Sequence, residues 1–339
     1  MKPTLPDPAV LQRRLDALAK KHGVPGATAG VLLGGQVEVM ATGVTRLGTQ
    51  LPVTPDTLFL IASITKVWTA TLVMQLVDEG LVDVDAPVND YLQPELRLGD
   101  AHVAKSVTVA QLLCHSGGFF GDSDEPGFRD DDAVRKTVEA YHTLPQLHRP
   151  GSMLSYSNAG FNVLGRLVEC VTKSTWDEAL KTRLLDPLGL QHTFTLPEDT
   201  MTQPLAVGHE PQSPDSLALS PVKTWLDPRG SGPCGGTLAT TSGDLLAFAG
   251  LHLRDGVGPS GQRLMSEASA LAMREPRIVQ PDPSMAPAWG WGWAVERLDS
   301  PSGGARRQHV RAAEPAGRRA RARPCRLPAR QRRRPGTAA

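Results

Sequence analysis

The 339-residue chain lacks the marks of a membrane protein and of a disulfide-rich secreted protein. No stretch approaches the roughly 20 consecutive apolar residues that a helix needs to cross a bilayer. The first thirty residues carry charged side chains and no run of seven apolar residues, which argues against a secretory signal. The four cysteines lie far apart and include no C-x-x-C pair. We therefore expect a cytoplasmic protein with reduced thiols that neither spans a membrane nor binds structural zinc.

Motifs for metal ions are absent as well. The nine histidines share no ligand spacing, and the acidic residues 122–132 do not follow the D-x-D-x-D-G-x5-E pattern of a calcium loop. We interpret residues 122–125 and 130–132 as parts of a solvated loop. The sequence predicts no metal and no cofactor.

The last 39 residues contain almost nothing that could fill a core. Residues 301–339 hold twelve arginines, no lysine, one acidic residue, no aromatic residue, one valine and one leucine. The other 300 residues carry 24 basic and 34 acidic side chains. We expect a disordered tail that forms neither a strand nor a packed helix. Such a tail is either a basic arm for nucleic acid or the frame-shifted end of a GC-rich gene. No groove-entering helix or stacking platform accompanies the arginines, so we favour the frame-shift over nucleic-acid binding.

Before this tail, the spacing of apolar residues predicts both helices and strands. A helix is expected over residues 8–22, where leucines recur at helical spacing after Asp7 and Pro8. A hairpin follows, with strands over residues 27–33 and 36–43 around a Gly-Gly turn. Further helices are expected after Ser63, Asn158 and Thr241, together with a strand over residues 234–240 and a glycine-tryptophan strand over residues 289–296.

The stretch around Ser63 carries the strongest chemical signal. Ser63 and Lys66 are three residues apart at the start of a helix, so both lie on one helical face. A serine hydroxyl needs a neighbour that takes its proton, and the lysine of an S-x-x-K box is such a neighbour. The alternative is an N-capping serine followed by an unrelated surface lysine.

The order of several motifs resembles that of the β-lactamase-related serine hydrolases, which include class C β-lactamases, D-alanyl-D-alanine peptidases and family VIII-type esterases. The resemblance covers residues 25–295. It rests on Ser63-Ile64-Thr65-Lys66, Leu112-Leu113-Cys114-His115-Ser116-Gly117-Gly118, Tyr156-Ser157-Asn158, Pro187-Leu188-Gly189-Leu190 and Gly235-Gly236-Thr237-Leu238-Ala239-Thr240.

The resemblance implies a role for four residues. Ser63 would form an acyl-enzyme, with its backbone N–H in the oxyanion hole. Tyr156 would be the general base, helped by the charge of Lys66, and Asn158 would hold Lys66 and donate to the substrate carbonyl. Alternatively, Tyr156 is a half-buried tyrosine and Asn158 an N-cap. His115 is expected to be structural rather than catalytic.

One motif of the family is missing. A third box, H-x-G or K-T-G, should follow the glycine-tryptophan strand, but the only histidine there is His309, followed by Val310 and Arg311. The resemblance implies an α+β fold, a β-lactamase/penicillin-binding-protein-like α/β/α sandwich over residues 1–300, with a helical insertion at about residues 95–225. We expect its C-terminal strands to be missing.

The expected function is hydrolysis of a small ester or amide through an acyl-serine, most simply as a carboxylesterase. The alternatives are β-lactamase or D-alanyl-D-alanine peptidase activity, and a catalytically impaired protein that only binds acyl ligands. The sequence leaves the oligomeric state open.

Overall fold

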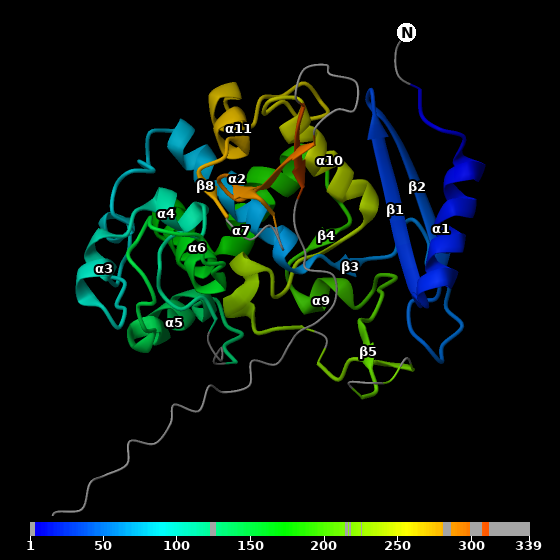
Figure 1. Ribbon diagram of the computed structural model, residues 1–339, viewed down its shortest axis with the longest axis horizontal. Helices are drawn as coiled ribbons and strands as arrows, with labels where there is room; N and C mark the ends of the chain where they lie inside the picture. The colour runs from blue at the N-terminus through cyan, green and yellow to red at the C-terminus, as the bar shows by residue number, and fades with distance from the viewer. Residues whose placement is uncertain are drawn as a thin grey trace, which may run out of the picture.

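The computed structural model describes residues 4–122, 127–213, 216, 218–224, 226–280, 286–298 and 307–311. For residues 297–298 and 307–311 it describes the backbone alone. Helices and antiparallel sheets alternate along the chain, as the α+β prediction requires (Figure 1).

The N-terminal layer follows the sequence closely. Helix α1 (Pro8–His22) begins at the Asp7 cap and ends at Gly23, whose φ of 63° is the left-handed conformation that glycine adopts readily. Strands β1 (Gly26–Leu33) and β2 (Gln36–Gly43) form the predicted hairpin, and α1 packs on it. The predicted bounds of the helix and the hairpin are therefore confirmed to within a residue.

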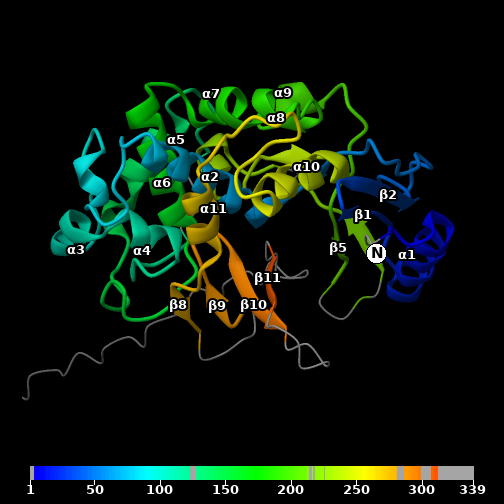
Figure 2. The same cartoon turned by 90° about the horizontal axis from the view of Figure 1, so that it is seen from above.

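Helix α2 (Thr65–Asp78) runs through the centre of the molecule (Figure 2). All of its residues from Thr65 to Leu76 are buried, because α6 (Asn158–Thr172), α7 (Trp176–Leu180) and α11 (Glu267–Arg274) pack around it. Trp68 of α2 also stacks on Phe248 of α10 (Ser242–Leu253). A helix that is buried on all sides belongs in a core, and α2 is the element around which the others are arranged.

The region between α2 and α10 holds seven of the α-helices of the described residues, whereas residues 201–225, the last part of the expected helical insertion, contain none in their described part. Its helices are α3 (Ala101–Ser106), α4 (Val109–Leu113), α5 (Ala133–Glu139), α6, α7, α8 (Asp186–Leu188) and α9 (Pro197–Thr200). Short strands also occur here: β4 (Thr193–Phe194), β5 (His209–Pro211) and β6 (Leu219–Pro221). Strand β4 joins β3 (Phe59–Leu60) and β7 (Ala239–Thr240) in a small sheet of order β3-β7-β4.

A second antiparallel sheet, of order β11-β10-β9-β8, forms the C-terminal part of the described chain (Figure 2). Its strands are β8 (Ile278–Val279), β9 (Ala288–Trp289), β10 (Ala294–Leu298) and β11 (Arg307–Arg311). The prediction of one continuous strand over residues 289–296 is wrong. Residues 290–293 instead form the turn between β9 and β10, because Gly292 has a φ of 83° and lies against Ala70 of α2.

Strand β11 corrects a second expectation. Residues 307–311 pair with β10, with His309 opposite Glu296 and Val310 opposite Val295, although we expected no strand in residues 301–339. The side-chain composition of residues 301–339 does not decide this pairing, because backbone N–H and C=O groups can form a ladder with any sequence. The prediction of a disordered tail also covers residues 301–306 and 312–339, and these lie outside the described part of the chain.

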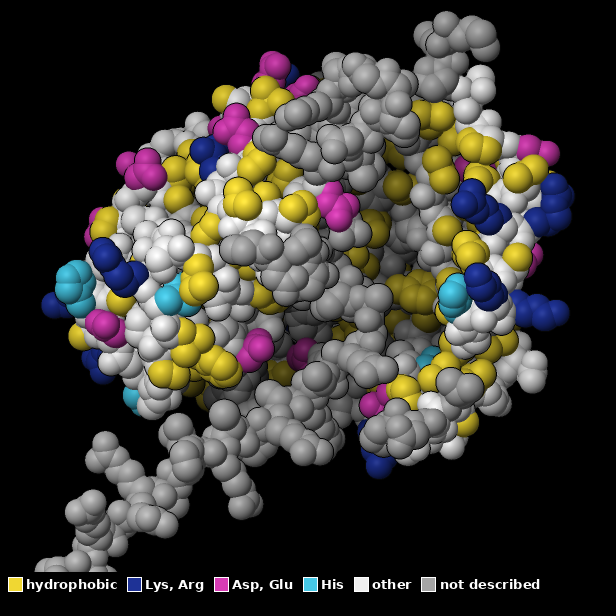
Figure 3. All heavy atoms as spheres, viewed as in Figure 1, with side chains coloured by type: hydrophobic (Ala, Val, Ile, Leu, Met, Phe, Trp, Pro, Cys, Tyr) yellow, Lys and Arg dark blue, Asp and Glu magenta, His cyan; other side chains and the backbone are white. Residues whose placement is uncertain are grey.

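The face seen in Figure 3 is hollowed between the α1–β2 layer and the rest of the molecule, with hydrophobic side chains in the hollow and charged ones around the edge. Within the described residues, no helix has both the length and the apolar character needed to cross a membrane. The same residues contain no group of three or more His, Cys, Asp or Glu side chains suited to a metal ion.

Candidate active site

Ser63 lies in η1 (Ala62–Ile64), the tight turn that leads into α2. The residue before it, Ala62, has a φ of 42°, which is unusual for a residue with a side chain. Gly235 passes directly against this turn: a Cβ at Gly235 would lie 2.3 Å from the Ala62 oxygen and 2.9 Å from the Ser63 nitrogen. The backbone of Ser63 is thus held between a strained residue and a glycine that no larger residue can replace.

Lys66 is the most completely bonded charged group of the site. Its Nζ donates to Ser63 Oγ at 3.2 Å, to Asn158 Oδ1 at 2.6 Å and to the Cys234 carbonyl at 2.6 Å. The residue is only 1% exposed. An ammonium group has three N–H donors, so these three acceptors satisfy it fully. This arrangement confirms the neighbourhood of Ser63 and Lys66 that their spacing predicts, and it rules out the surface-lysine alternative.

Asn158 reaches Lys66 because another residue caps its helix. Ser157 is the N-cap of α6, and its Oγ accepts a hydrogen bond from the Gly160 N–H at 2.9 Å. The alternative in which Asn158 is the N-cap is therefore wrong. Its Oδ1 is free to accept from Lys66, and its Nδ2 donates to Asp122 Oδ1 at 2.7 Å.

Tyr156 presents its ring, rather than its hydroxyl, to the lysine. Lys66 Nζ lies 4.8 Å from the ring centroid, a distance at which an aromatic face attracts a cation. The buried Tyr156 Oη has no hydrogen-bond partner among the described residues. A buried hydroxyl without a partner is costly, so this group is suited to a bond that a substrate would supply.

His115 lies behind the tyrosine. Its ring stacks on Tyr156 with centroids 4.4 Å apart, and its Nδ1 accepts from the Ser157 N–H at 3.1 Å. Burial, and then the nearby Lys66 charge, hold the pKa of His115 well below its usual range. A neutral imidazole bonded to the backbone is a support for the Tyr156–Asn158 segment. His115 has no hydrogen bond to Ser63, in keeping with the structural role expected for it.

Two contacts of the site were missed by the sequence reasoning. The Cys234 carbonyl bonds Lys66, but we expected a strand over residues 234–240, whereas only Ala239–Thr240 form one. Asp122 was interpreted as part of a solvated loop, and it is exposed, but its carboxylate contacts Asn158. The signals were the Gly-Gly pair after Cys234 and the Gly121-Asp122 step after the His115 motif, since glycines mark close backbone approach.

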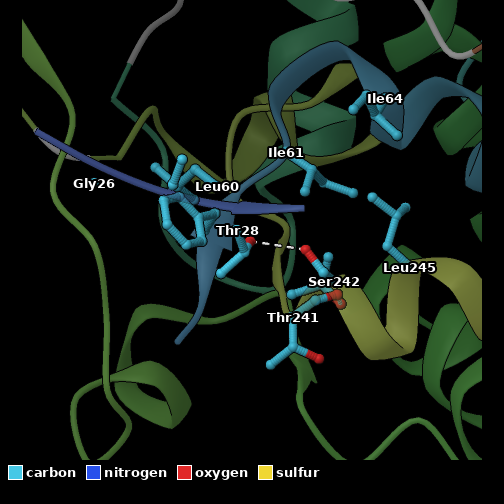
Figure 4. Close-up of a pocket in the computed structure, with 11 residues that line it drawn as sticks. Gly26, Thr28, Leu60, Ile61, Ile64, Thr241, Ser242 and Leu245 are labelled. Carbon is cyan, nitrogen blue, oxygen red and sulfur yellow. Dashed lines mark hydrogen bonds between the residues drawn. The ribbon is translucent and has the colours of Figure 1, made fainter. Parts of the chain in front are cut away.

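A cavity of about 290 Å³ lies beside this site but does not contain it (Figure 4). It separates β1 from the start of α2, and Ile61, Ile64 and Leu245 line its apolar side. A hydrogen bond of 2.7 Å between the hydroxyls of Thr28 and Ser242 spans it. Ser63, Lys66, Tyr156 and Asn158 are not among its lining residues, so this cavity is separate from the hydrogen-bond network of Lys66.

Comparison with known proteins identifies relatives of this chain. The beta-lactamase family profile matches residues 11–317. Penicillin-binding protein 4 of Amycolatopsis lactamdurans is 41% identical over 299 residues, which cover 88% of this chain and 78% of that protein. A D-stereospecific amidohydrolase from Streptomyces sp. has a similar structure, with a TM-score of 0.66 and 27% identity over 86% of this chain and 84% of that one. D-amino acid amidase from Ochrobactrum anthropi SV3 has a TM-score of 0.71 and 23% identity over 87% of this chain and 83% of that one.

The likeness to the 23% identical amidase concerns the fold alone. Other curated relatives are longer, and this chain spans 43% of the length of one and 60% of another. The fold expected from the resemblance is nevertheless confirmed, and members of this family are serine hydrolases. With a family match over residues 11–317 and a relative that is 41% identical over 299 residues, the chain belongs to the beta-lactamase family.

Proposed function

We propose that the protein hydrolyses esters or amides through an acyl-serine at Ser63. The observation that carries this proposal is the hydrogen bond of 3.2 Å between Lys66 Nζ and Ser63 Oγ, inside a buried network that also fixes Asn158. An ordinary surface serine has no such neighbour. A buried lysine beside a serine supplies the charge and the proton path that nucleophilic attack requires.

In the proposed acylation, Ser63 Oγ attacks the carbonyl carbon and forms the new C–O bond. Lys66, which is bonded to Oγ, first passes one of its protons to Tyr156, the proposed general base, and then takes the hydroxyl proton from Ser63, while the negative charge develops on the carbonyl oxygen. Collapse of the tetrahedral intermediate breaks the bond to the leaving group. The proton is then returned to the leaving oxygen or nitrogen, and Tyr156 is the residue proposed to give it, because its buried Oη lacks a partner.

Deacylation reverses these roles. Water attacks the acyl-serine, its proton passes to the Lys66–Tyr156 pair, and Ser63 leaves with a proton restored to Oγ. One N–H of Asn158 Nδ2 donates to Asp122. The other N–H is proposed to donate to the substrate carbonyl. The Ser63 backbone N–H is proposed as an oxyanion donor.

For the substrate we propose a small carboxylic ester, as in a carboxylesterase, in a cytoplasmic setting. The alternative of amide or D-peptide hydrolysis is supported by the relatives named as an amidohydrolase and a penicillin-binding protein. A β-lactam would be a further acylating agent for the same serine. Parallel assays with an aryl acetate, a D-amino acid amide and a cephalosporin would rank the three by kcat/KM, and an aryl acetate in first place is the expected result.

Labelling with a fluorophosphonate tests the proposed chemistry directly. The Ser63 oxygen should displace fluoride and become phosphonylated, and mass spectrometry should find the label on that residue. The Ser63→Ala variant should lose the label, whereas Ser106→Ala, a change on the exposed end of α3, should keep it. Label that persists in Ser63→Ala would refute the assignment of the nucleophile.

The alternative of an impaired, acyl-binding protein rests on the third motif. Strand β11 carries His309 beside β10, but Arg311 stands where H-x-G has its glycine. This alternative predicts that Ser63 of the folded parent protein resists the fluorophosphonate while an acyl ligand still binds. The labelling experiment therefore separates the two functions.

A further inference from the structure

We propose that Asp122 is a positioning residue that holds the Asn158 amide in one orientation, including in those steps where Lys66 has given up a proton. The inference rests on the function proposed above, and it assigns a role to a residue that the sequence places in a solvated loop. Its starting point is a chain of three hydrogen bonds. Asp122 accepts from Asn158 at 2.7 Å, Asn158 accepts from Lys66 at 2.6 Å, and Lys66 donates to Ser63 at 3.2 Å.

The backbone places Asp122 firmly against the site. The Gly121 carbonyl, one residue earlier, accepts a hydrogen bond from the Ala159 N–H at 2.9 Å. Gly121 also lies directly against the Tyr156–Asn158 segment, because a Cβ there would lie 2.4 Å from the Tyr156 carbonyl oxygen. The contact between Asp122 and Asn158 therefore follows from the packing of two backbone segments rather than from the chance position of a long side chain.

The two ends of an amide differ in what they can bond. A carboxylate only accepts hydrogen bonds and an ammonium only donates them, so Asp122 takes the Nδ2 end of Asn158 and charged Lys66 takes the Oδ1 end. While Lys66 carries its full charge, both neighbours favour the same orientation. Asp122 is then a second, redundant constraint.

The constraint from Asp122 becomes decisive once Lys66 transfers a proton. A neutral amine has a lone pair and can accept a hydrogen bond, so Lys66 would then tolerate either end of the amide. Rotation of the Asn158 amide would turn N–H groups toward Lys66 and move the second N–H away from the substrate carbonyl. Asp122 still requires an N–H donor at that moment, and it therefore keeps Oδ1 directed at Lys66 for the return of the proton.

An exposed carboxylate usually contributes little to stability, so the expected effect of Asp122 is on rate. Asp122→Ala should lower kcat by about 10- to 100-fold, as for other residues that orient a catalytic group, with a smaller change in KM. Asp122→Asn should have an intermediate effect, because its amide can still accept from Nδ2 but can also present a donor. The midpoint of thermal unfolding should be unchanged in both.

The matched control is Asp130→Asn. Asp130 belongs to the same acidic stretch and is exposed, but its carboxylate accepts hydrogen bonds from Lys136 at 2.5 Å and from the Asp132 N–H at 3.1 Å, and from none of the four site residues. This variant should keep the kcat and KM of the parent protein. A loss equal to that of Asp122→Asn would mean that the charge of the stretch matters, rather than the contact with Asn158, and would overturn the proposal.

A second measurement reads the amide directly and needs no substrate. The chain has only three asparagines, Asn89, Asn158 and Asn162, so labelling with ¹⁵N-asparagine gives three pairs of side-chain N–H resonances. Asn89 and Asn162 are bonded elsewhere, to the Leu96 and Ala104 carbonyls and to the Tyr141 hydroxyl. In Asp122→Ala, only the Asn158 pair should shift and exchange faster with solvent.

The two measurements separate this proposal from the proposed function. If the parent protein neither takes the fluorophosphonate nor turns over esters, the function fails, and the Asn158 resonances still decide whether Asp122 holds the amide. If the Asn158 pair is unmoved in Asp122→Ala, or if kcat of an active protein stays within twofold of the parent value, Asp122 is not the positioning residue.

Discussion

The ammonium nitrogen of Lys66 lies 3.2 Å from the hydroxyl oxygen of Ser63, three residues earlier in the chain. The same nitrogen lies 4.8 Å from the centre of the Tyr156 ring. Of these two residues, Lys66 is therefore the one that forms a hydrogen bond with Ser63, because the Tyr156 hydroxyl has no partner among the described residues. Any proton path from Ser63 to Tyr156 begins at Lys66.

The first prediction is that Lys66 and Tyr156 act on one proton. Lys66→Met and Tyr156→Phe should each slow acylation of Ser63, by about 100-fold or more if either is needed for general base catalysis. The double variant should be little slower than the slower single one, because groups that act as a unit lose their effect together. Stopped-flow acylation by an aryl ester measures all four rates, and circular dichroism checks the fold. Losses that simply multiply would argue against a shared proton.

The second prediction concerns the glycine behind the nucleophile. Gly235→Ala should destabilise the protein by about 2 kcal/mol or more, because the new Cβ meets the Ala62 oxygen and the φ of 124° is strained for alanine. Relief of the clash would displace Ser63 and slow its labelling, by about 100-fold for a shift near 1 Å. Urea unfolding and labelling rates measure the two effects.

A glycine in a helix provides the control for this change. In α10, a Cβ at Gly243 would make an ordinary contact of 3.8 Å with Thr241 Oγ1. Gly243→Ala should therefore stabilise the protein by up to about 1 kcal/mol and leave labelling unchanged. Equal losses of stability in the two variants would show that the close approach of Gly235 is not what matters.

The third prediction is a loss of stability on acidification below about pH 6.5. Burial lowers the pKa of His252 to about 3, with Arg274 adding to the effect, and the pKa of His115 is also lowered. Between the folded and unfolded pKa values, the unfolded chain binds protons that the native state does not. The free energy of unfolding therefore falls as the pH falls, by up to about 1.4 kcal/mol per pH unit for each histidine.

Urea unfolding at pH 7, 6 and 5 measures this slope. His252→Gln should flatten it, and the amide can still donate to Thr71 in place of Nε2. Burial raises the pKa of Glu169, which acts in the opposite direction nearer pH 4.5, so the comparison goes no lower than pH 5. His102→Gln, on the exposed side of α3, should leave the slope as it is. An unchanged slope in His252→Gln would contradict the prediction.

Local features of this chain could be predicted from the sequence, and distant contacts could not. The helix over residues 8–22, the first hairpin and the Ser63–Lys66 pair follow from spacing of a few residues. The Lys66 bonds to Asn158 and Cys234 join residues 92 and 168 positions apart, and only the fold brings them together. Family resemblance supplied Asn158, but nothing pointed to the Cys234 carbonyl, because a backbone acceptor has no residue type.

The glycine-tryptophan segment shows a different kind of limit. Trp289 and Trp293 are buried, as suits large apolar side chains. The predicted strand was wrong because alternation of glycine and tryptophan satisfies both a strand and a tight turn. The contact of Gly292 with Ala70 of α2 favours the turn, and this contact between residues far apart in the sequence cannot be seen in the local pattern.

The last prediction concerns β11, the strand that composition did not predict. The backbone pairs of β10 with β11 should protect the ladder amides of residues 294–298 and 307–311 from hydrogen exchange. The protection should persist when His309 or Val310 is replaced by Thr, since backbone groups make the ladder and threonine suits a strand. Removal of residues 299–339 should abolish protection on the β11 side of β10 and expose an edge that favours aggregation.

Hydrogen exchange with mass spectrometry and light scattering on the truncated and full chains measure both effects. Truncation after residue 311 is the matched control, since it removes the arginine-rich end but keeps β11. This control should behave like the full chain in both measurements. If residues 307–311 of the full chain exchange as fast as an unfolded peptide, β11 does not form in solution, and our original expectation for residues 301–339 would stand.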